Sequence, residues 1–479
     1  MNRYKWQNLG FIILVLLFFL PGPQNIFADM KKNGTANSQR ECLDCHGRSN
    51  INTNEGVAAS QAFCNECHLK AQTQRQIDGK KVSLQVPSDM FQGNPHKYIA
   101  CIHCHTDVAR SPHRSQIGVQ CSSCHHAHSE VQAHEPHLRV RCEACHFKSE
   151  PVILNLNSDK VELAHQDGLK TPISLSKHQM TDSQDNQMCL KCHVAENTAG
   201  APAIVLPAKS VLCIMCHNAP LQIGHGMFWI ASLIGALGLV SMVFFWFKGS
   251  LGDENASFHQ KISHSSEAIW TTIFSRRFKT IFKIFIFDII LQRRILQESV
   301  QRWSMHSLIY LAFLGRLCLS LFTVITYKVA PDSNLALSLI DKNNWFCASV
   351  NDLLGLFIVL GVTLAIIQRF VTKPRHVLSK EQDIIALIII GLLVFSGFLA
   401  EGVRILVTQI PSDIAIYSFG GYLIAKVLAV SGSDFQSAYG YVWYAHAIIW
   451  AFFIAYLPFG KLKHILTTPL SLLLPKLGD

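Results

Sequence analysis

The chain has 479 residues, of which 49% are hydrophobic and 15% are charged, and it carries a net charge of +10. A chain of this length usually folds as more than one domain. Much of the excess positive charge lies in loops beside long apolar segments, which excludes it as an argument for nucleic-acid binding.

The first 28 residues are typical of an export signal. A basic start precedes twelve apolar residues at 9–20, and Ala28 ends a cleavage-type sequence before Asp29. Twelve apolar residues are short for a membrane span, which needs about 20. We predict a signal peptide at 1–28, with an uncleaved anchor as the alternative. Both place the residues that follow outside the cytoplasm.

Seven C-x-x-C-H motifs occupy residues 29–224, which hold fourteen of the sixteen cysteines. Disulfides are the first expectation in an oxidising compartment, but they have no use for the histidine, and a zinc ribbon does not require it. Covalent haem attachment needs all three residues, because two thiols add to the haem vinyl groups and the imidazole binds the iron. The motifs are CLDCH (42–46), CNECH (64–68), CIHCH (101–105), CSSCH (121–125), CEACH (142–146), CLKCH (189–193) and CIMCH (213–217).

We therefore predict seven covalently attached haem c groups in a domain at 29–224. Because the motifs follow one another closely, the haems themselves would form much of its core. We expect a loop-rich, mainly α fold that conducts electrons from haem to haem. The attaching residues are Cys42, Cys45, Cys64, Cys67, Cys101, Cys104, Cys121, Cys124, Cys142, Cys145, Cys189, Cys192, Cys213 and Cys216. The proximal iron ligands are His46, His68, His105, His125, His146, His193 and His217.

Other histidines of this domain are candidates for the distal side of each iron. Four of them precede a motif by a short interval: His96, His113, His137 and His178. His126 and His128 follow the fourth motif directly, and we expect one of them to reach a neighbouring iron. A c haem without a sixth ligand would be a catalytic site, so a terminal reductase stays an alternative.

An all-α membrane domain is predicted at 225–479. Its five apolar runs of spanning length lie at about 227–247, 305–327, 349–369, 384–408 and 438–459. Lys and Arg concentrate in the connections 248–304 and 370–383, whereas 328–348 and 409–437 hold few. The positive-inside rule then predicts an inner-membrane protein with the haem c domain on the periplasmic side and the C-terminus in the cytoplasm.

Histidines within or beside these runs are candidate haem b ligands. His306 lies at the inner end of the second run and His464 just beyond the inner end of the fifth. Both therefore lie at a similar depth, as two axial ligands of one haem would. His446 lies 18 residues before His464, or about 27 Å along a helix, and belongs to the outer level. The alternative for His446 is a hydrogen bond between helices.

Three segments of this half resemble the respiratory nitrate reductase gamma subunit family, which includes membrane cytochromes of heterodisulfide-reductase complexes. They are FDIILQRRILQESVQRW (287–303), MHSLIYLAFLGR (305–316) and HAIIWAFFIAYLPFGKLKHILTTPLSLLL (446–474). The resemblance implies that His306 and His464 bind one haem b, and that His446 binds a second, outer one. Arg316 occupies the position of the fourth family histidine, so one or two haems b are expected. His225 is a candidate substitute ligand, either for an outer haem b or for a c haem.

Glu401 and Arg404 are spaced three residues apart near the outer end of the fourth run, on one face of a helix. Such a pair can be purely structural, or it can line a quinone pocket in which Glu401 accepts a proton. Arg316 is a further candidate for this pocket, or for neutralising a haem propionate.

The combined prediction is a membrane-bound oxidoreductase subunit of quinol:cytochrome c type. It would transfer electrons between membrane quinone and periplasmic cytochromes or a terminal reductase, with quinol oxidised through haem b to the seven c haems. The alternative is a transmembrane conduit for a cytoplasmic iron–sulfur subunit. No nucleic-acid partner is expected.

Overall fold

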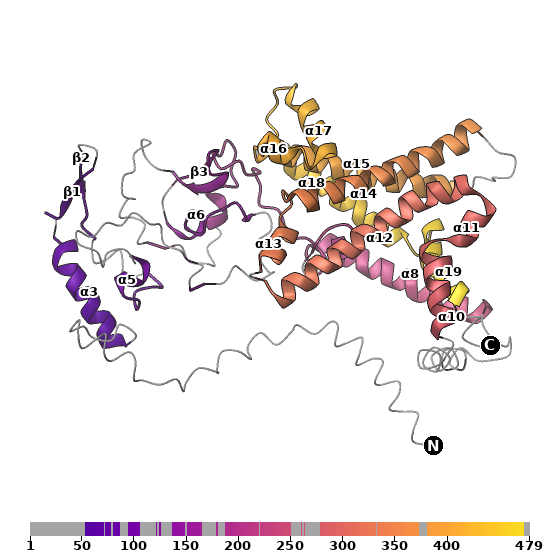
Figure 1. Ribbon diagram of the computed structural model, residues 1–479, viewed down its shortest axis with the longest axis horizontal. Helices are drawn as coiled ribbons and strands as arrows, with labels where there is room; N and C mark the ends of the chain where they lie inside the picture. Colours follow the sequence, from indigo (N-terminus) through magenta and orange to yellow (C-terminus); the bar gives the residue numbers. More distant parts are fainter. Residues whose placement is uncertain are drawn as a thin grey trace, which may run out of the picture. The chain divides into compact units, whose positions relative to one another are not determined.

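The structure of the protein is a computed structural model (Figure 1). Its contacts divide the chain into two compact units, Met1–Gly118 and Val119–Asp479. The described residues are 53–70, 72–77, 80–86, 94–105, 121, 124–125, 137–148, 151–164, 179–180, 187–219, 221–250, 260, 263, 278–331, 333–372 and 381–473.

The first unit contains short elements around the second and third motifs. Helix α3 (Asn54–His68) ends on the histidine of the second motif, and α5 (Cys101–Cys104) covers most of the third. An antiparallel hairpin of β1 (Gln74–Ile77) and β2 (Lys80–Ser83) lies between them in the sequence. Helix α3 begins where the Thr53 hydroxyl accepts a hydrogen bond from the Gly56 amide at 3.1 Å, which is an N-cap.

The cysteine-rich part of the second unit is also built from short elements. Helix α6 (Cys142–His146), helix α7 (Gln187–Leu190) and the 3₁₀ helix η6 (Val211–Met215) each lie on a motif. The hairpin of β3 (Val152–Asn155) and β4 (Lys160–Leu163) pairs in antiparallel register, with Val152 opposite Leu163. A small core of buried Ala144, Val152, Val161, Leu163 and Ala199 holds this part together. The predicted loop-rich, mainly α fold is confirmed.

Among the described residues, five helices are long and apolar enough to cross a membrane, as many as the predicted spans. They are α8 (Gly226–Ser250), α12 (Val300–Val329), α14 (Trp345–Ile367), α15 (Glu381–Val407) and α18 (Gln436–Tyr456). Polar residues set where two of them begin: the Ser299 hydroxyl caps α12, and the Asn344 side-chain carbonyl caps α14. The protein is therefore a multi-pass membrane protein.

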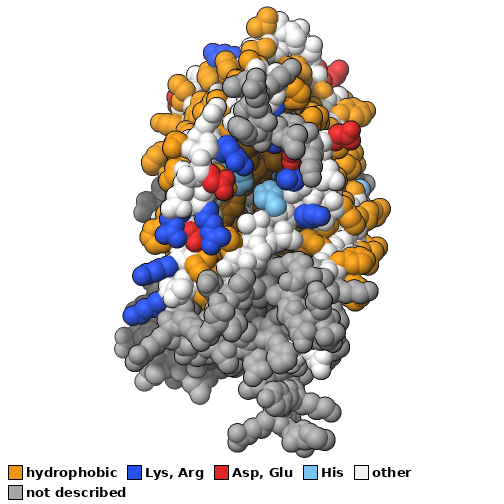
Figure 2. Space-filling model, turned by 90° about the vertical axis from the view of Figure 1, so that its right-hand side faces the viewer, with side chains coloured by type: hydrophobic (Ala, Val, Ile, Leu, Met, Phe, Trp, Pro, Cys, Tyr) orange, Lys and Arg blue, Asp and Glu red, His pale blue; other side chains and the backbone are white. Residues whose placement is uncertain are grey.

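The five spans pack as a bundle in which α12 contacts α14, α14 contacts α15, α15 contacts α18, and α18 contacts α8. Phe228, Ile358, Phe398 and Trp450 are buried in its core. Large apolar side chains also cover its outside, where Val240 is 66% exposed and Phe395 is 60% exposed. Figure 2 shows such side chains, in orange, along both flanks of the bundle. An apolar exterior of this kind is suited to lipid rather than to water.

The two ends of the bundle differ in what covers them. We call the end that contacts residues 137–225 the near end; it also carries α13 (Asn334–Ile340) and α16 (Ser412–Ala415). The short apolar helix α17 (Phe419–Ala429) packs on α15. The far end carries α10 (Phe278–Lys283), the π-helix η7 (Ile284–Ile290), α11 (Arg293–Glu298) and α19 (His464–Leu473).

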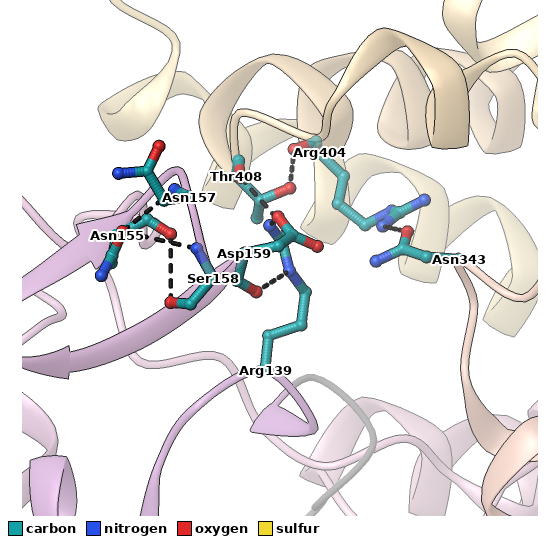
Figure 3. Close-up of polar contacts among 8 residues, drawn as sticks. All are labelled: Arg139, Asn155, Asn157, Ser158, Asp159, Asn343, Arg404 and Thr408. Carbon is teal, nitrogen blue, oxygen red and sulfur yellow. Dashed lines mark hydrogen bonds and ion pairs between the residues drawn. The ribbon is translucent and has the colours of Figure 1, made fainter.

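Direct hydrogen bonds join the β3–β4 hairpin region to the near end (Figure 3). Arg139 donates to the Asp159 carbonyl at 3.0 Å and to the Thr408 carbonyl at 3.4 Å, and it also pairs with the Asp159 carboxylate. Gln436, at the start of α18, donates to the Asn197 carbonyl at 3.2 Å. Contacts therefore cross the predicted domain boundary at residues 224–225, which itself stays a prediction.

Candidate haem-ligand histidines

Two histidines that sequence reasoning placed at one depth lie side by side at the far end of the bundle. The ring centres of His306, on α12, and His464, at the start of α19, are 5.9 Å apart, with the rings tilted by 57°. Figure 2 looks onto this end and shows a hollow with histidine side chains at its margin.

Each ring of this pair is held by its Nδ1 atom. His464 Nδ1 lies 2.8 Å from the Lys461 carbonyl, and His306 Nδ1 lies 2.9 Å from the Gln292 side-chain oxygen. Both partners are oxygen acceptors, so Nδ1 carries the proton and Nε2 keeps a lone pair for a metal. Gln292 is buried and has a positive φ of 55°, a conformation uncommon outside glycine, which points to a positional role.

The spacing of the two rings fits a shared iron. A metal–imidazole bond is about 2 Å long and a ring centre lies about 1 Å beyond the nitrogen, so opposite imidazoles on one metal have centres about 6 Å apart. Ring spacing alone does not identify an iron site, because the ring centres of His225 and Tyr444 are also 6.1 Å apart. The Nδ1 hydrogen bonds are therefore a second criterion. His306 and His464 satisfy both criteria and fit the two axial positions of one haem.

A second pair of histidines lies toward the near end. The ring centres of His217, from the seventh motif, and His446, from α18, are 6.2 Å apart, and the rings are inclined by 75°. His446 Nδ1 lies 2.9 Å from the Ser396 hydroxyl of α15. Burial and the nearby cations Lys209, Arg316 and Lys342 hold the pKa of His217 well below its usual value, so its ring is neutral at physiological pH, as a metal ligand must be.

A third pair lies in the cysteine-rich part. The ring centres of His193, from the sixth motif, and His137 are 6.2 Å apart, and His193 Nδ1 lies 2.9 Å from the Pro202 carbonyl. His137 therefore lies against the histidine of the sixth motif, although the fifth motif follows it directly in sequence; its role as a distal ligand stays a prediction. In the first unit, His68 Nδ1 is 2.8 Å from the Leu84 carbonyl, the same fixed orientation of a proximal histidine.

The cysteines of successive motifs lie close together within each unit. Side-chain hydrogen bonds connect Cys64 with Cys101 and Cys121 with Cys142. Burial and these neighbours raise the pKa of Cys101 and of Cys121 to about 11. Cys192 lies close enough to Cys145 for the two to interact electrostatically. None of the described cysteines forms a disulfide.

Several predicted ligands lie outside the described residues, and their roles stay predictions: Cys42, Cys45, His46, His113, His126, His128 and His178. The other predicted attachment and proximal residues are described. His96 is half-buried beside buried Asn94, whose side chain accepts a hydrogen bond from the His96 amide at 2.7 Å. Its role as a distal ligand also stays a prediction.

The three residues predicted for a quinone pocket make different contacts. Arg404 donates to the Asn343 side chain at 2.9 Å (Figure 3). It also lies 3.8 Å from Glu401, which supports the structural interpretation of the Glu401–Arg404 pair. Arg316 donates to the Asn351 carbonyl, directly before Asp352 on α14, and hydrogen-bonds the Cys216 sulfur.

Sequence reasoning missed an acidic residue at the heart of this region. Asp352, on α14, is 1% exposed; it shares a side-chain hydrogen bond with Glu401 and accepts another from the Gly420 amide at 2.7 Å. A hydrogen bond between two carboxyl groups requires a proton on one of them. Glu401 is the more accessible partner, with 25% of its side chain exposed. The signal in the sequence was an acid inside an apolar run.

A pocket of about 470 Å³ lies elsewhere in the bundle, at the far end. It is lined by Met242, Phe245, Lys463, Thr467 and Ser471. Neither Glu401 nor a candidate ligand histidine is among these lining residues.

Comparison with known proteins gives relatives for the membrane half. Residues 323–477 match the nitrate reductase gamma subunit family, a region that includes His446 and His464. No solved structure matches the chain.

Curated relatives point the same way. The E subunit of the dihydromethanophenazine:CoB–CoM heterodisulfide reductase of Methanosarcina thermophila is 32% identical over 205 residues, which are 42% of this chain and 69% of the relative. The same protein of Methanosarcina acetivorans is 30% identical over 205 residues, with the same shares. Its counterpart in Methanosarcina barkeri is 30% identical over 207 residues, or 42% and 70% of the two chains.

Proposed function

Because this chain belongs, through its membrane half, to the family of the heterodisulfide reductase E subunit, we propose that it transfers electrons between a membrane quinol and a chain of covalently attached haems. The family and the five spans make it a membrane electron-transfer subunit. The haem types, the quinol and the direction of transfer belong to the proposal.

The observation that supports it most directly is the far-end pair of His306 and His464. Both rings are fixed through Nδ1, and their 5.9 Å spacing suits one iron. These two side chains would hold a haem b between α12 and α19. The haem iron, when bound, supplies reversible one-electron chemistry at a potential set by its surroundings.

The seven C-x-x-C-H motifs would hold the haem c chain. Support comes from the thiol contacts between successive motifs: Cys64 with Cys101 in the first unit, and Cys121 with Cys142 in the second. His137 would complete the iron site of the sixth motif. Attachment points this close leave neighbouring haems no room to lie far apart.

Quinol oxidation needs a proton acceptor near an electron acceptor, and the near end offers one. Glu401 lies five residues after Ser396 on α15, about 7.5 Å along the helix, and Ser396 holds the ring of His446. Glu401 would accept a proton and share it with Asp352 through their hydrogen bond. The proton acceptor Glu401 and the electron acceptor at His446 would thus lie within about two helical turns of one another along α15.

A second function is supported by the far end. The hollow at that end is surrounded by Lys and Arg side chains (Figure 2). Arg293 and Arg294, on α11 at this end, pair with buried Asp288 at 3.0 and 3.8 Å. A cytoplasmic iron–sulfur subunit could dock on this surface, with the protein then serving as its transmembrane conduit.

The test is a redox titration of the full-length protein, with pyridine haemochrome spectra to count haem b and haem c and a menaquinol analogue as reductant. We expect haem b together with seven haem c, and reduction of both by the quinol. Absence of c-type haem would overturn the proposed chain, and absence of quinol reduction would overturn the proposed substrate. Co-purification with an iron–sulfur protein would favour the conduit.

A further inference from the structure

We infer that His217 and His446 are the two axial ligands of one covalently attached haem, which makes the near-end haem of the membrane bundle a c-type haem. The inference rests on the proposed attachment of haem at Cys213 and Cys216. It assigns the seventh motif a distal ligand from a membrane helix, and it replaces the expectation of an outer haem b at His446.

The first support is the orientation of His446. Its Nδ1 lies 2.9 Å from Ser396 Oγ, and this hydroxyl donates its own hydrogen to the Leu393 carbonyl at 3.0 Å. Because that hydrogen is used, the Ser396 oxygen accepts from the ring, so the proton lies on Nδ1 and Nε2 keeps its lone pair. The ring centre of His217 is 6.2 Å away, the separation that two axial imidazoles of one iron require.

The second support is that the seventh motif is part of the bundle. Cys213 and Met215 pack against its hydrophobic core, and η6 contacts α12. Trp450 of α18 donates its indole N–H to the Leu212 carbonyl at 3.0 Å. The backbone closes behind the motif through a 2.7 Å hydrogen bond from the Val211 amide to the Gln222 carbonyl. His217 is thus held inside the bundle rather than on a separate domain.

The third support is Arg316, which occupies the position on α12 where a fourth haem b histidine was expected. A guanidinium stays protonated and has no lone pair for iron. Arg316 hydrogen-bonds the Cys216 sulfur instead, and its buried Nε has no partner among the described residues. His446 therefore has no partner from α12, while His217 stands opposite it.

This assignment gives the two halves of the chain a shared redox site. Arg316 and His306 are ten residues apart on α12, about 15 Å along that helix, so one helix contributes to both the near-end and the far-end region. The far-end pair would hold the haem b, and the near-end pair would hold the last haem of the c chain. The chain of c haems then enters the membrane bundle itself.

The test compares His446→Ala with His464→Ala in the full-length protein by pyridine haemochrome counting and electron paramagnetic resonance. In His446→Ala we expect unchanged numbers of haem b and haem c, with one c haem converted from low to high spin and returned to low spin by added imidazole. In His464→Ala we expect loss of haem b, with every c haem remaining low spin.

Two results would overturn the inference. Loss of a b-type haem in His446→Ala, with all c haems low spin, would make His446 a haem b ligand. Unchanged spin states would make it a structural residue. If His446→Ala does not accumulate, His446→Met serves instead, because a His/Met pair raises the potential of one c haem without altering the haem count. Failure of the underlying proposal would be distinct, since the unsubstituted protein would then lack haem c.

Discussion

Asp352 and Glu401 share a hydrogen bond between α14 and α15, in the part of the bundle nearest the cysteine-rich segment. Asp352 is almost fully buried and is held by the Gly420 amide, whereas Glu401 stays partly exposed. Gly421 allows this approach, because a Cβ there would lie 2.4 Å from Glu401 Cγ. One carboxyl group is fixed and the other accessible, an arrangement suited to passing a proton inward from a substrate.

Replacement of Glu401 by Gln should slow quinol oxidation by about 10²- to 10⁴-fold, the usual contribution of a general base. Gln keeps the size of the side chain and can still hydrogen-bond Asp352, so the haem spectra should not change. The measurement is the rate of haem reduction by a menaquinol analogue, together with the haem count.

Arg404→Gln is the matched control, because Arg404 is the ion-pair partner of Glu401 at 3.8 Å. If Glu401 only balances the charge of Arg404, the two variants should behave alike. If Glu401 accepts a proton, Arg404→Gln should keep most of the rate. Equal rates in Glu401→Gln and the unsubstituted protein would remove the proton role.

Loss of either far-end histidine should remove the haem b. We expect His306→Ala and His464→Ala each to abolish the b-type pyridine haemochrome signal while leaving haem c attached, since the c haems are held by thioether bonds. His225→Ala tests the alternative ligand: we expect it to leave this haem b in place, because the ring of His225 lies against Tyr444. Retention of haem b in both far-end variants would refute this site.

These two cases show what the sequence could predict. The common depth of His306 and His464 follows from helix length alone, so their juxtaposition could be expected before any coordinates. Asp352 was not recognised, because its carboxyl partner lies on another helix and no local spacing connects the two. The five spans could be predicted for a similar reason, because each is a long apolar run that can be recognised in the sequence.

The partner of His446 could not be predicted, because it depends on how residues 211–223 insert between helices. The motif spacing predicts a haem at His217, and the apolar run predicts a membrane position for His446, but neither indicates that the two meet. Trp450, which fixes the insertion, looks like any core aromatic in the sequence. Its hydrogen bond to Leu212 is a tertiary contact across 238 residues.

Gln292 should tune the haem b site without being a ligand. Its side-chain oxygen accepts from His306 Nδ1 and from the Ser307 hydroxyl at 3.3 Å, which sets the orientation of the ring. Gln292→Ala should weaken haem b retention by about 10- to 100-fold, as loss of such an outer partner usually does. The haem b content that remains after washing in detergent measures this retention. Gln260→Ala, on another segment of the chain, is the control for a general effect of a Gln→Ala substitution. Full retention would show that Lys461 and α12 packing suffice.

Trp450→Phe should loosen the seventh motif while preserving the core. Phe fills most of the volume of Trp but cannot donate to the Leu212 carbonyl, so we expect a loss of about 1 kcal/mol in stability from the missing hydrogen bond. The thermal midpoint, followed through haem c absorbance in detergent, should fall, and the iron held by His217 and His446 should show a broadened low-spin signal. Trp229→Phe on α8 is the matched control, because Trp229 is 60% exposed. Identical midpoints for both variants would mean that the motif is held in the bundle by packing and covalent attachment, without a contribution from this hydrogen bond.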